Sequence, residues 1–228
     1  MFKKTGICFL GLILALNVLK RSSALAATKP LKITPQNTVI VDGSTYAGTN
    51  LQYYLVKLYV GDKEAAPLGA SQVDRSSTPY FPIVKTGATI PADKNIIAIG
   101  RTKYLSDADK ARLEAAPNGA TLIKREGNVI VVAGSPFDNP WLGDFTAMSD
   151  FLNYVCGIRF YGPDDLWTSR PKSTFISVGD LDSFREEAFA TTYLAPYYKR
   201  NQDWIRLNYT ANRITINVNH NLGNIFPP

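Results

Sequence analysis

The residues of this sequence that could most readily carry out catalysis are acidic residues that act in pairs. Two carboxylates a few ångströms apart can serve as general acid and general base when both point into one site. The sequence has adjacent acidic pairs at Asp164-Asp165 and Glu186-Glu187, but neighbours along a strand point to opposite faces of a sheet. We therefore expect both pairs in turns or on the solvated surface. From Ala188 onward the only acidic residue is Asp203, which we interpret as a helix cap or surface group, so we predict no catalytic residue.

Histidine and cysteine are too scarce for the common nucleophilic and metal sites. His220 is the only histidine, so neither a histidine-based triad nor a histidine-rich metal site can be complete within the chain. Cys8 lies in the apolar N-terminal segment, and Cys156 just before a glycine is most simply a small buried apolar residue. The sequence has no phosphate-binding loop, dinucleotide fingerprint or Gly-x-Ser-x-Gly elbow. We expect no metal and no cofactor.

The N-terminal residues have the pattern of an export signal. Lys3 and Lys4 precede an apolar run from Ile7 to Leu19, and Ala24-Leu25-Ala26 gives the small-x-small pattern of a cleavage site. The apolar run is too short to cross a bilayer comfortably. The alternative to a cleaved signal peptide is a retained N-terminal anchor. We expect a signal peptide over residues 1–26, cleaved near Ala26, and a secreted or periplasmic mature chain without a membrane span.

The net charge argues against a nucleic-acid partner. The chain carries 25 Lys and Arg against 19 Asp and Glu, a formal charge of +6. Four of the cations lie in the leader, which has no acidic residue, so the remaining chain has 21 against 19, or +2. No basic stripe remains to follow a phosphate backbone. A hydrophobic content of 45% with 19% charged residues also excludes a disordered protein.

Downstream of the leader, the hydrophobic pattern predicts alternating strands and helices. Short β-rich runs predict strands at residues 38–41, 96–100, 121–124, 129–132 and 158–161. Three helices are predicted, one with Leu51 and Leu55 on its apolar face, one opened by Ser106, and one with Phe145 and Met148 on its apolar face. Residues 65–91 are predicted to form a long loop. Two versions of this loop remain open, one continuous and one with an edge strand near Tyr80–Val84.

These elements predict a layered α/β (α+β) domain, with a mixed β-sheet packed against helices, over residues 28–182. The composition becomes dense in Asn, Arg and Tyr after Phe184–Glu187, which marks the approximate end of this domain. Asp138 and Asp144 flank Pro140-Trp141, and we interpret them as a loop residue and as a charge at the N-terminus of the third helix.

Three stretches of the sequence together resemble a known family. The first is the opening strand and the helix with Leu51, Leu55 and Leu58, followed by the strand Ile96–Gly100. The second runs from Gly127–Gly134 through Ala147–Leu152 to Cys156–Pro163, and the third comprises Trp204, Asn212-Arg213 and Asn219-His220. This order is similar to the N-terminal α/β domain of alpha-glucuronidase-like glycoside hydrolases and the entry into their catalytic barrel. The small domain also resembles the second domain of beta-hexosaminidases.

The resemblance implies that residues 183–228 begin a (β/α)8 catalytic barrel. Residues 189–197 and 214–217 would be its first strands, with residues 204–211 in the helix between them. A complete barrel needs about 250 residues, so the sequence holds only the start of an incomplete barrel. Because the family's chemistry resides in the barrel, the resemblance implies that the α/β domain is a non-catalytic accessory domain.

The resemblance also implies a set of substrate-binding residues. The family places substrate contacts near the predicted second barrel strand, which corresponds here to Arg213, Asn219 and His220. Residues that follow a barrel strand face the mouth of the active site. In the alternative interpretation, His220 is a polar residue in a frayed terminus.

Two functions remain open from the sequence. In the first, the chain is the N-terminal portion of an exported glycoside hydrolase that degrades polysaccharide, and the α/β domain packs against a catalytic barrel. In the second, it is a stand-alone carbohydrate-binding or interaction module, whose aromatic side chains stack on sugar rings. Core and interface packing is the default role for most such aromatics. The candidates are Trp141, Trp167, Trp204, Tyr53, Tyr54, Tyr197 and Tyr198. An oligo- or polysaccharide is the expected partner.

Overall fold

The computed structural model describes residues 29–44, 46–60, 81–117, 119–136, 140–161, 168–171, 173 and 175–186. Its strands are β1 (Leu31–Ile33), β2 (Thr38–Gly43), β3 (Ile83–Lys85), β4 (Asn95–Gly100), β5 (Ala120–Glu126), β6 (Val129–Gly134), β7 (Arg159–Phe160), β8 (Thr168–Ser169), β9 (Ile176–Val178) and β10 (Asp182–Glu186). Its helices are α2 (Ala47–Val60), α3 (Asp107–Ala115) and α4 (Pro140–Asp150), and α4 continues as a π-helical turn over Phe151–Val155.

A six-stranded mixed sheet in the order β10-β5-β6-β4-β2-β3 forms the centre of the domain. β3, β2, β4 and β6 are parallel to one another, whereas β5 is antiparallel to both β6 and β10. Two antiparallel pairs, β1 with β9 and β7 with β8, form small separate sheets. The predicted layered α/β class with a mixed sheet is therefore confirmed, and the described strands form open sheets.

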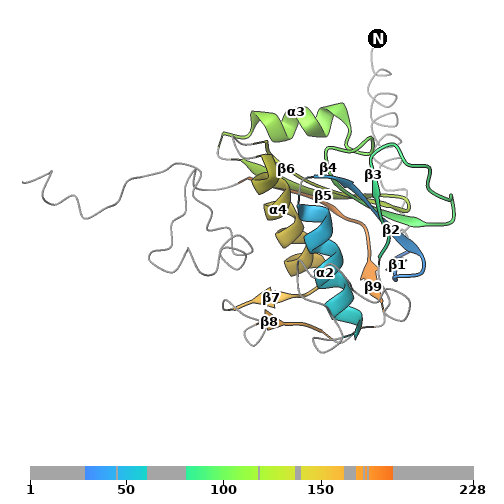
Figure 1. Cartoon of the computed structure of the whole chain (residues 1–228). Helices are drawn as coiled ribbons and strands as arrows, with labels where there is room; N and C mark the ends of the chain where they lie inside the picture. The colour runs from blue at the N-terminus through green and yellow to red at the C-terminus, as the bar shows by residue number, and fades with distance from the viewer. Residues whose placement is uncertain are drawn as a thin grey trace, which may run out of the picture.

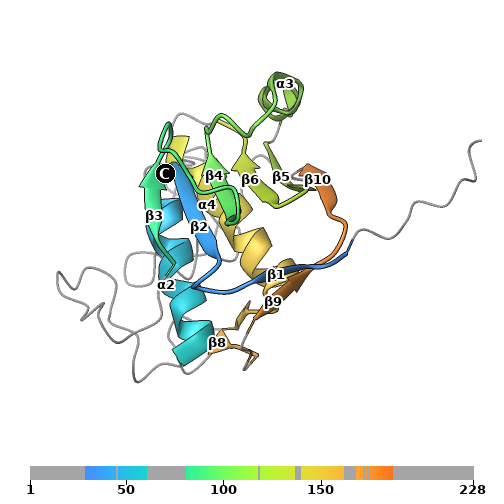
Figure 2. The same ribbon diagram turned by 90° about the vertical axis from the view of Figure 1, so that its right-hand side faces the viewer.

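Helices cover both faces of the main sheet (Figures 1 and 2). α2 and α4 lie on one face, where they enclose the largest core cluster together with strand residues such as Ile97 and Val132. α3 lies on the opposite face, over a smaller cluster that includes Leu113, Leu122 and Val131. The neighbours Val131 and Val132 thus point to opposite faces of β6, as the pleat of a strand requires.

Local sequence signals account for most of the element boundaries. The apolar face of α2 is buried as predicted, with Leu51 and Leu55 fully inaccessible to solvent. Ser106 caps α3, because its Oγ accepts a hydrogen bond from the backbone N–H of Asp109 at 3.1 Å. The predicted edge strand near residues 80–84 is present as β3, which pairs with β2.

The end of the third helix departs from regular α-helical geometry. Phe145 and Met148 point into the core as predicted, and Leu152 lies in the same core cluster. The backbone N–H of Cys156 donates to the carbonyl oxygen of Phe151 at 3.1 Å, an i→i+5 bond that widens the last turn. Gly157 follows with a φ of +72°, a left-handed conformation that favours glycine and ends the helix.

β10 crosses the boundary that the sequence predicted between residues 182 and 183. Ser183–Glu186 pair with β5 from Ile123 to Ala120, so the sheet extends to Glu186. Arg185 anchors this strand, since its Nε and Nη2 donate to Oδ2 of the buried Asp150 at 3.1 and 2.9 Å. The same oxygen accepts a hydrogen bond from the hydroxyl of Thr121 on β5. The predicted barrel strands at 189–197 and 214–217 lie outside the described residues.

Replacing Arg185 by alanine is expected to lower the free energy of unfolding by about 1–3 kcal/mol, because it removes charge-assisted hydrogen bonds from a buried carboxylate. The 36% exposure of the Arg185 side chain favours the lower end of that range. Urea denaturation followed by circular dichroism measures the change. The exposed Glu186→Gln substitution on the same strand serves as control and should change stability by less than about 0.5 kcal/mol. Equal stability of the two variants would show that Arg185 does not anchor β10.

Candidate functional site

The parallel strands β2, β4 and β6 bring three glycines to one edge of the sheet. These strands end at Gly43, Gly100 and Gly134. A Cβ on Gly134 would lie 1.9 Å from the carbonyl oxygen of Gly143 in α4. Gly100 has a φ of +74°, and a Cβ there would lie 2.7 Å from Oδ2 of Asp144. The chain therefore needs glycine at these positions, because neighbouring atoms approach too closely for any side chain.

Asp42 occupies the end of β2 beneath the first turn of α2, and only 4% of its surface is exposed. Its Oδ1 accepts hydrogen bonds from the backbone N–H and the hydroxyl of Ser44, at 2.9 and 2.7 Å. The N–H of Gly48 in turn donates to Ser44 Oγ at 3.2 Å. A Cβ on Gly48 would collide with the Asp42 carboxylate at 2.4 Å. Asp42 is therefore used to join β2 to α2.

Asp144 is the second buried carboxylate at this edge, and it corrects the expectation of a charge at the helix N-terminus. It lies in the second turn of α4 with 6% of its surface exposed, and its Oδ1 accepts a hydrogen bond from the N–H of Gly134 at 3.1 Å. The pKa of the Asp144 carboxyl is raised to about 6, chiefly by burial and to a smaller extent by the Asp42 carboxylate, while the Gly134 hydrogen bond and the Arg101 guanidinium limit the increase. The periodicity around Phe145 and Met148 does not reveal that a charged residue faces inward here.

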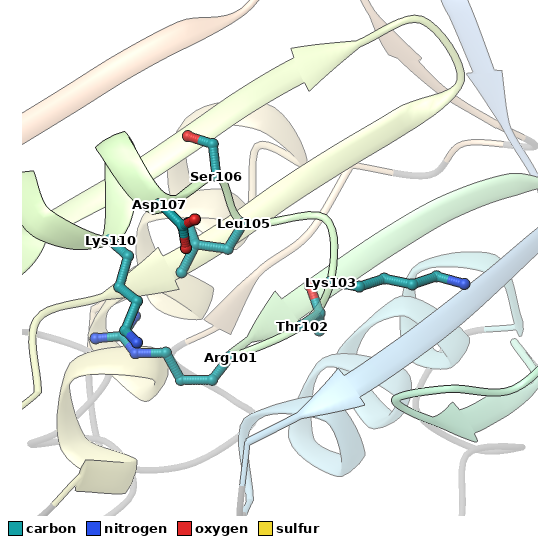
Figure 3. Close-up of a pocket in the computed structure, with 7 residues that line it drawn as sticks. All are labelled: Arg101, Thr102, Lys103, Leu105, Ser106, Asp107 and Lys110. Carbon is teal, nitrogen blue, oxygen red and sulfur yellow. The ribbon is translucent and has the colours of Figure 1, made fainter.

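A pocket of about 580 Å³ lies beside this edge, where the chain passes from β4 to α3 (Figure 3). It is lined by Arg101, Thr102, Lys103, Leu105, Ser106, Asp107 and Lys110. The loop that forms it begins at the left-handed Gly100 and ends at the Ser106 cap of α3. Arg101 and Lys110 extend toward one side of the pocket and Lys103 toward the other (Figure 3). The sequence analysis did not single out this loop, although the cations at 101, 103 and 110 around the Ser106 cap are a readable signal.

Most of the residues that the sequence nominated lie outside the described part of the chain. Arg213, Asn219 and His220, the implied substrate-binding residues, are among them, as are Asp203 and the Asp164-Asp165 pair. Glu186 lies exposed on β10, in agreement with a solvated role. Cys156 is buried as predicted, and burial raises the pKa of its thiol.

The described residues contain neither a candidate metal site nor a candidate membrane span. Among these residues, no three His, Cys, Asp or Glu side chains are grouped so that they could hold a metal ion. None of the described helices combines the length and the apolar character that a membrane span requires.

The aromatic residues proposed for sugar stacking separate into core residues and residues that are not described. Tyr54 is buried and packs edge-on against Phe160, with ring centroids 5.2 Å apart, and Tyr53 packs edge-on against Tyr54. The tryptophan side chains and the tyrosines at 197 and 198 lie outside the described part of the structure.

Two exposed tyrosines that the sequence analysis did not nominate lie near the end of α4 and β7. Tyr154 is 65% exposed and Tyr161 is 70% exposed. The guanidinium of Arg159 lies 5.9 Å from the centre of the Tyr154 ring. Arg159 and Tyr161 flank the buried Phe160, so alternation along the chain places both on the outer side. The same alternation was readable in the sequence.

Comparison with known proteins gives little further guidance. No family model matches the sequence, and no curated protein matches it. A structural similarity exists to the solved structure of CpGH84D, with a TM-score of 0.31 and 14% sequence identity. The match covers 69% of this chain and 22% of the CpGH84D chain, so it spans about a fifth of that protein. It is a weak link to a glycoside hydrolase, and its TM-score is too low to carry an inference about function.

The raised pKa of Asp144 predicts how stability depends on pH. The folded state holds this proton more tightly than the unfolded state, so the stabilisation is complete below about pH 4 and is lost as the pH rises through about 6. Asp144→Asn keeps an oxygen for the Gly134 N–H and removes the charge. The variant should therefore gain stability relative to the native protein between pH 4 and pH 7, by up to about 3 kcal/mol.

Urea denaturation across this pH range tests the prediction. Asp93→Asn is the matched control, because the Asp93 side chain is 77% exposed and its removal should leave the pH profile unchanged. A constant difference between Asp144→Asn and the native protein across the range would contradict the burial of a carboxyl that titrates near pH 6.

Proposed function

We propose that the described domain is the non-catalytic domain of an exported glycoside hydrolase-like protein that acts in polysaccharide degradation. The domain would hold and orient a catalytic barrel, of which residues 183–228 would form only the start. The leader over residues 1–26 would direct the protein to the periplasm or the exterior. Arg213, Asn219 and His220 would contact substrate only as part of that barrel.

The observation that carries the non-catalytic assignment is that the buried carboxylates are committed to the fold. Asp42 accepts hydrogen bonds from Ser44 at the start of the β2–α2 connection. Asp144 accepts from the backbone of Gly134, and Asp150 accepts from Thr121 and Arg185. Glycosidases need two carboxylates that face the scissile bond with space for sugar between them. Gly48 and Gly100 fill that space, because a single Cβ on either residue would collide with Asp42 or Asp144.

The sequence supports the carbohydrate part of the proposal. The order of the hairpin around Gly127-Asn128, the helix ending in Phe151-Leu152 and the segment Gly157–Pro163 resembles the N-terminal domain of alpha-glucuronidase-like enzymes. In the structure, these segments form β5 and β6, α4 with its π-helical turn, and β7. They pack together as one unit around the core that contains Met148, Leu152 and Phe160.

A second candidate function is a carbohydrate-binding module, favoured by the exposed Tyr154 and Tyr161. Tyrosine rings combine a flat apolar surface with a polar hydroxyl, which suits stacking against a sugar ring. Arg159 lies beside Tyr154 and could donate hydrogen bonds to sugar hydroxyls, since a guanidinium has five N–H donors. In this case the domain would bind polysaccharide without a barrel.

The purified chain is expected to show no hydrolysis of aryl-glycosides, aryl-glucuronides included. The reason is that the buried carboxylates of the described residues leave no space between them for a sugar. The assay compares the native chain with Asp42→Asn and Asp144→Asn, and all three should match the buffer background. Reproducible hydrolysis that is lost in either variant would identify a catalytic carboxylate and refute the proposed function.

Affinity electrophoresis in polysaccharide gels tests the binding alternative. If the domain binds through its exposed tyrosines, Tyr154→Ala and Tyr161→Ala should each weaken binding about tenfold, which corresponds to about 1.4 kcal/mol of lost stacking. Tyr46→Ala, which removes a ring of 57% exposure at the start of α2, is the matched control and should bind like the native chain. Unretarded migration of the native chain would exclude this function for the polysaccharides tested.

A further inference from the structure

The pocket beside β4 lies where the topology of the sheet favours a ligand site. The connection after β2 leads to α2 on one face of the sheet, whereas the connection after the adjacent parallel strand β4 leads to α3 on the other face. Connections that diverge in this way leave a crevice outside the carboxyl ends of the strands, and ligands of open α/β sheets bind in such crevices. Arg101 to Ser106 form the β4–α3 connection and supply most of the pocket lining.

The charges of the pocket are unbalanced. Three cations, Arg101, Lys103 and Lys110, face one carboxylate, Asp107, which gives the lining a net charge of +2. Within the described part of the chain, none of these cations forms a salt bridge, and Lys103 has only a ring contact, 5.3 Å from the centre of Tyr104. A cleft lined by charges of one sign concentrates ligands of the opposite sign.

A neighbouring lysine shows that the fold can neutralise a cation on this face. The ammonium of Lys124 lies 3.4 Å from Asp109 and 2.8 Å from Glu126, which together raise its pKa. Lys110 is one residue beyond Asp109 on the same helix and has no such partner among the described residues. Lys110 therefore adds an unpaired positive charge to the pocket.

Arg101 supplies an independent observation that points to a missing acceptor. Its two terminal nitrogens, Nη1 and Nη2, are both buried, and neither has a hydrogen-bond partner. Leaving buried donors of a charged group unsatisfied costs free energy. A guanidinium presents its N–H groups as a fork that matches the oxygens of a carboxylate or phosphate. Because Arg101 is part of the pocket lining, an oxyanion bound in the pocket is a candidate acceptor for these donors.

We propose that this pocket binds a small molecule that carries a dianionic oxyanion group, either a phosphate monoester or a pair of carboxylates. The net charge of +2 matches a dianion, and the volume of about 580 Å³ falls within the usual range of small-molecule sites. Arg101 and Lys110 contact the oxyanion, and Lys103 adds to the attractive field from the opposite side of the pocket (Figure 3). The pocket residues are not among the substrate residues named in the proposed function, so this proposal does not depend on that function.

Isothermal titration calorimetry of the full chain with inorganic phosphate and with malonate, at fixed ionic strength, tests the proposal. We expect saturable binding of at least one of these probes. A preference for phosphate would identify the phosphate-monoester class, and a preference for malonate the dicarboxylate class. Absence of saturable binding for both probes overturns the proposal, as does equal binding heat from sodium chloride at the same ionic strength.

Charge variants locate the site. Lys110→Gln is expected to weaken binding about fivefold and Lys103→Gln less, because screened unit charges near a protein surface contribute on the order of 1 kcal/mol. Asp107→Asn should have the opposite effect and tighten binding, since it removes the only carboxylate of the lining. All three residues are exposed, so the fold should be unaffected. Lys32→Gln on β1 is the charge-matched control and should bind like the native chain.

Arg101→Gln should abolish measurable binding, provided that circular dichroism shows a native fold. If that variant fails to fold, the Lys110→Gln and Asp107→Asn pair still decides the question. Equal affinities of these two variants, or an equal loss in Lys32→Gln, would show that the probes bind elsewhere.

Discussion

The contact between the end of β6 and the helix α4 is the constraint on which the rest of the domain depends. The backbone of Gly134 lies against the carbonyl of Gly143 at a distance that no side chain permits. This contact sets the position of the helix along the sheet. Asp144 then falls beneath Gly100, and Met148 enters the core. Asp150, six residues after Asp144, accepts hydrogen bonds from Thr121 on β5 and Arg185 on β10, so the same helix also holds the edge strand β10.

The two faces of the sheet differ because of this arrangement. On the face covered by α2 and α4, glycines let the helices approach so closely that the acidic groups near the strand ends are enclosed and hydrogen-bonded. On the other face, α3 packs on apolar residues of β5 and β6, while its N-terminal end leaves the pocket beside Arg101. The buried carboxylates Asp42, Asp144 and Asp150 are thus hydrogen-bonded within the fold. The pocket cations Arg101, Lys103 and Lys110 form no salt bridge among the described residues, which favours recognition of anions over acid–base catalysis at this end of the sheet.

The sequence predicted local structure well because the signals were local. The Ser106 cap, the hairpin turn with Gly127 at a φ of +61° and the apolar face of α2 depend on residues a few positions apart. The inward position of Asp144 depends on Gly134, ten residues away, and on a helix packing distance that periodicity does not encode. The place of β10 at the sheet edge depends on pairing between segments about sixty residues apart, such as Arg185 with Thr121. A contiguous window of sequence cannot contain such information.

The glycines that close the strand ends also explain why the site was harder to predict than the fold. In the sequence, each of the three glycines Gly43, Gly100 and Gly134 looks like an ordinary strand end. Only the parallel register of β2, β4 and β6 brings them together at one end of the sheet. Because the three glycines share that end of the sheet, the surroundings of the residue that follows each glycine are set by the neighbouring elements. Ser44 bonds to Asp42, Ser135 bonds to Ala120 and Leu113, and Arg101 is left with buried nitrogens that no protein group satisfies. All three strand-end connections contain hydrogen bonds, and after β4 these run through Thr102. Of the three, the connection after β4 is the one that also holds unsatisfied buried donors, those of Arg101, and their free-energy cost is the reason to look for a ligand in the pocket beside it.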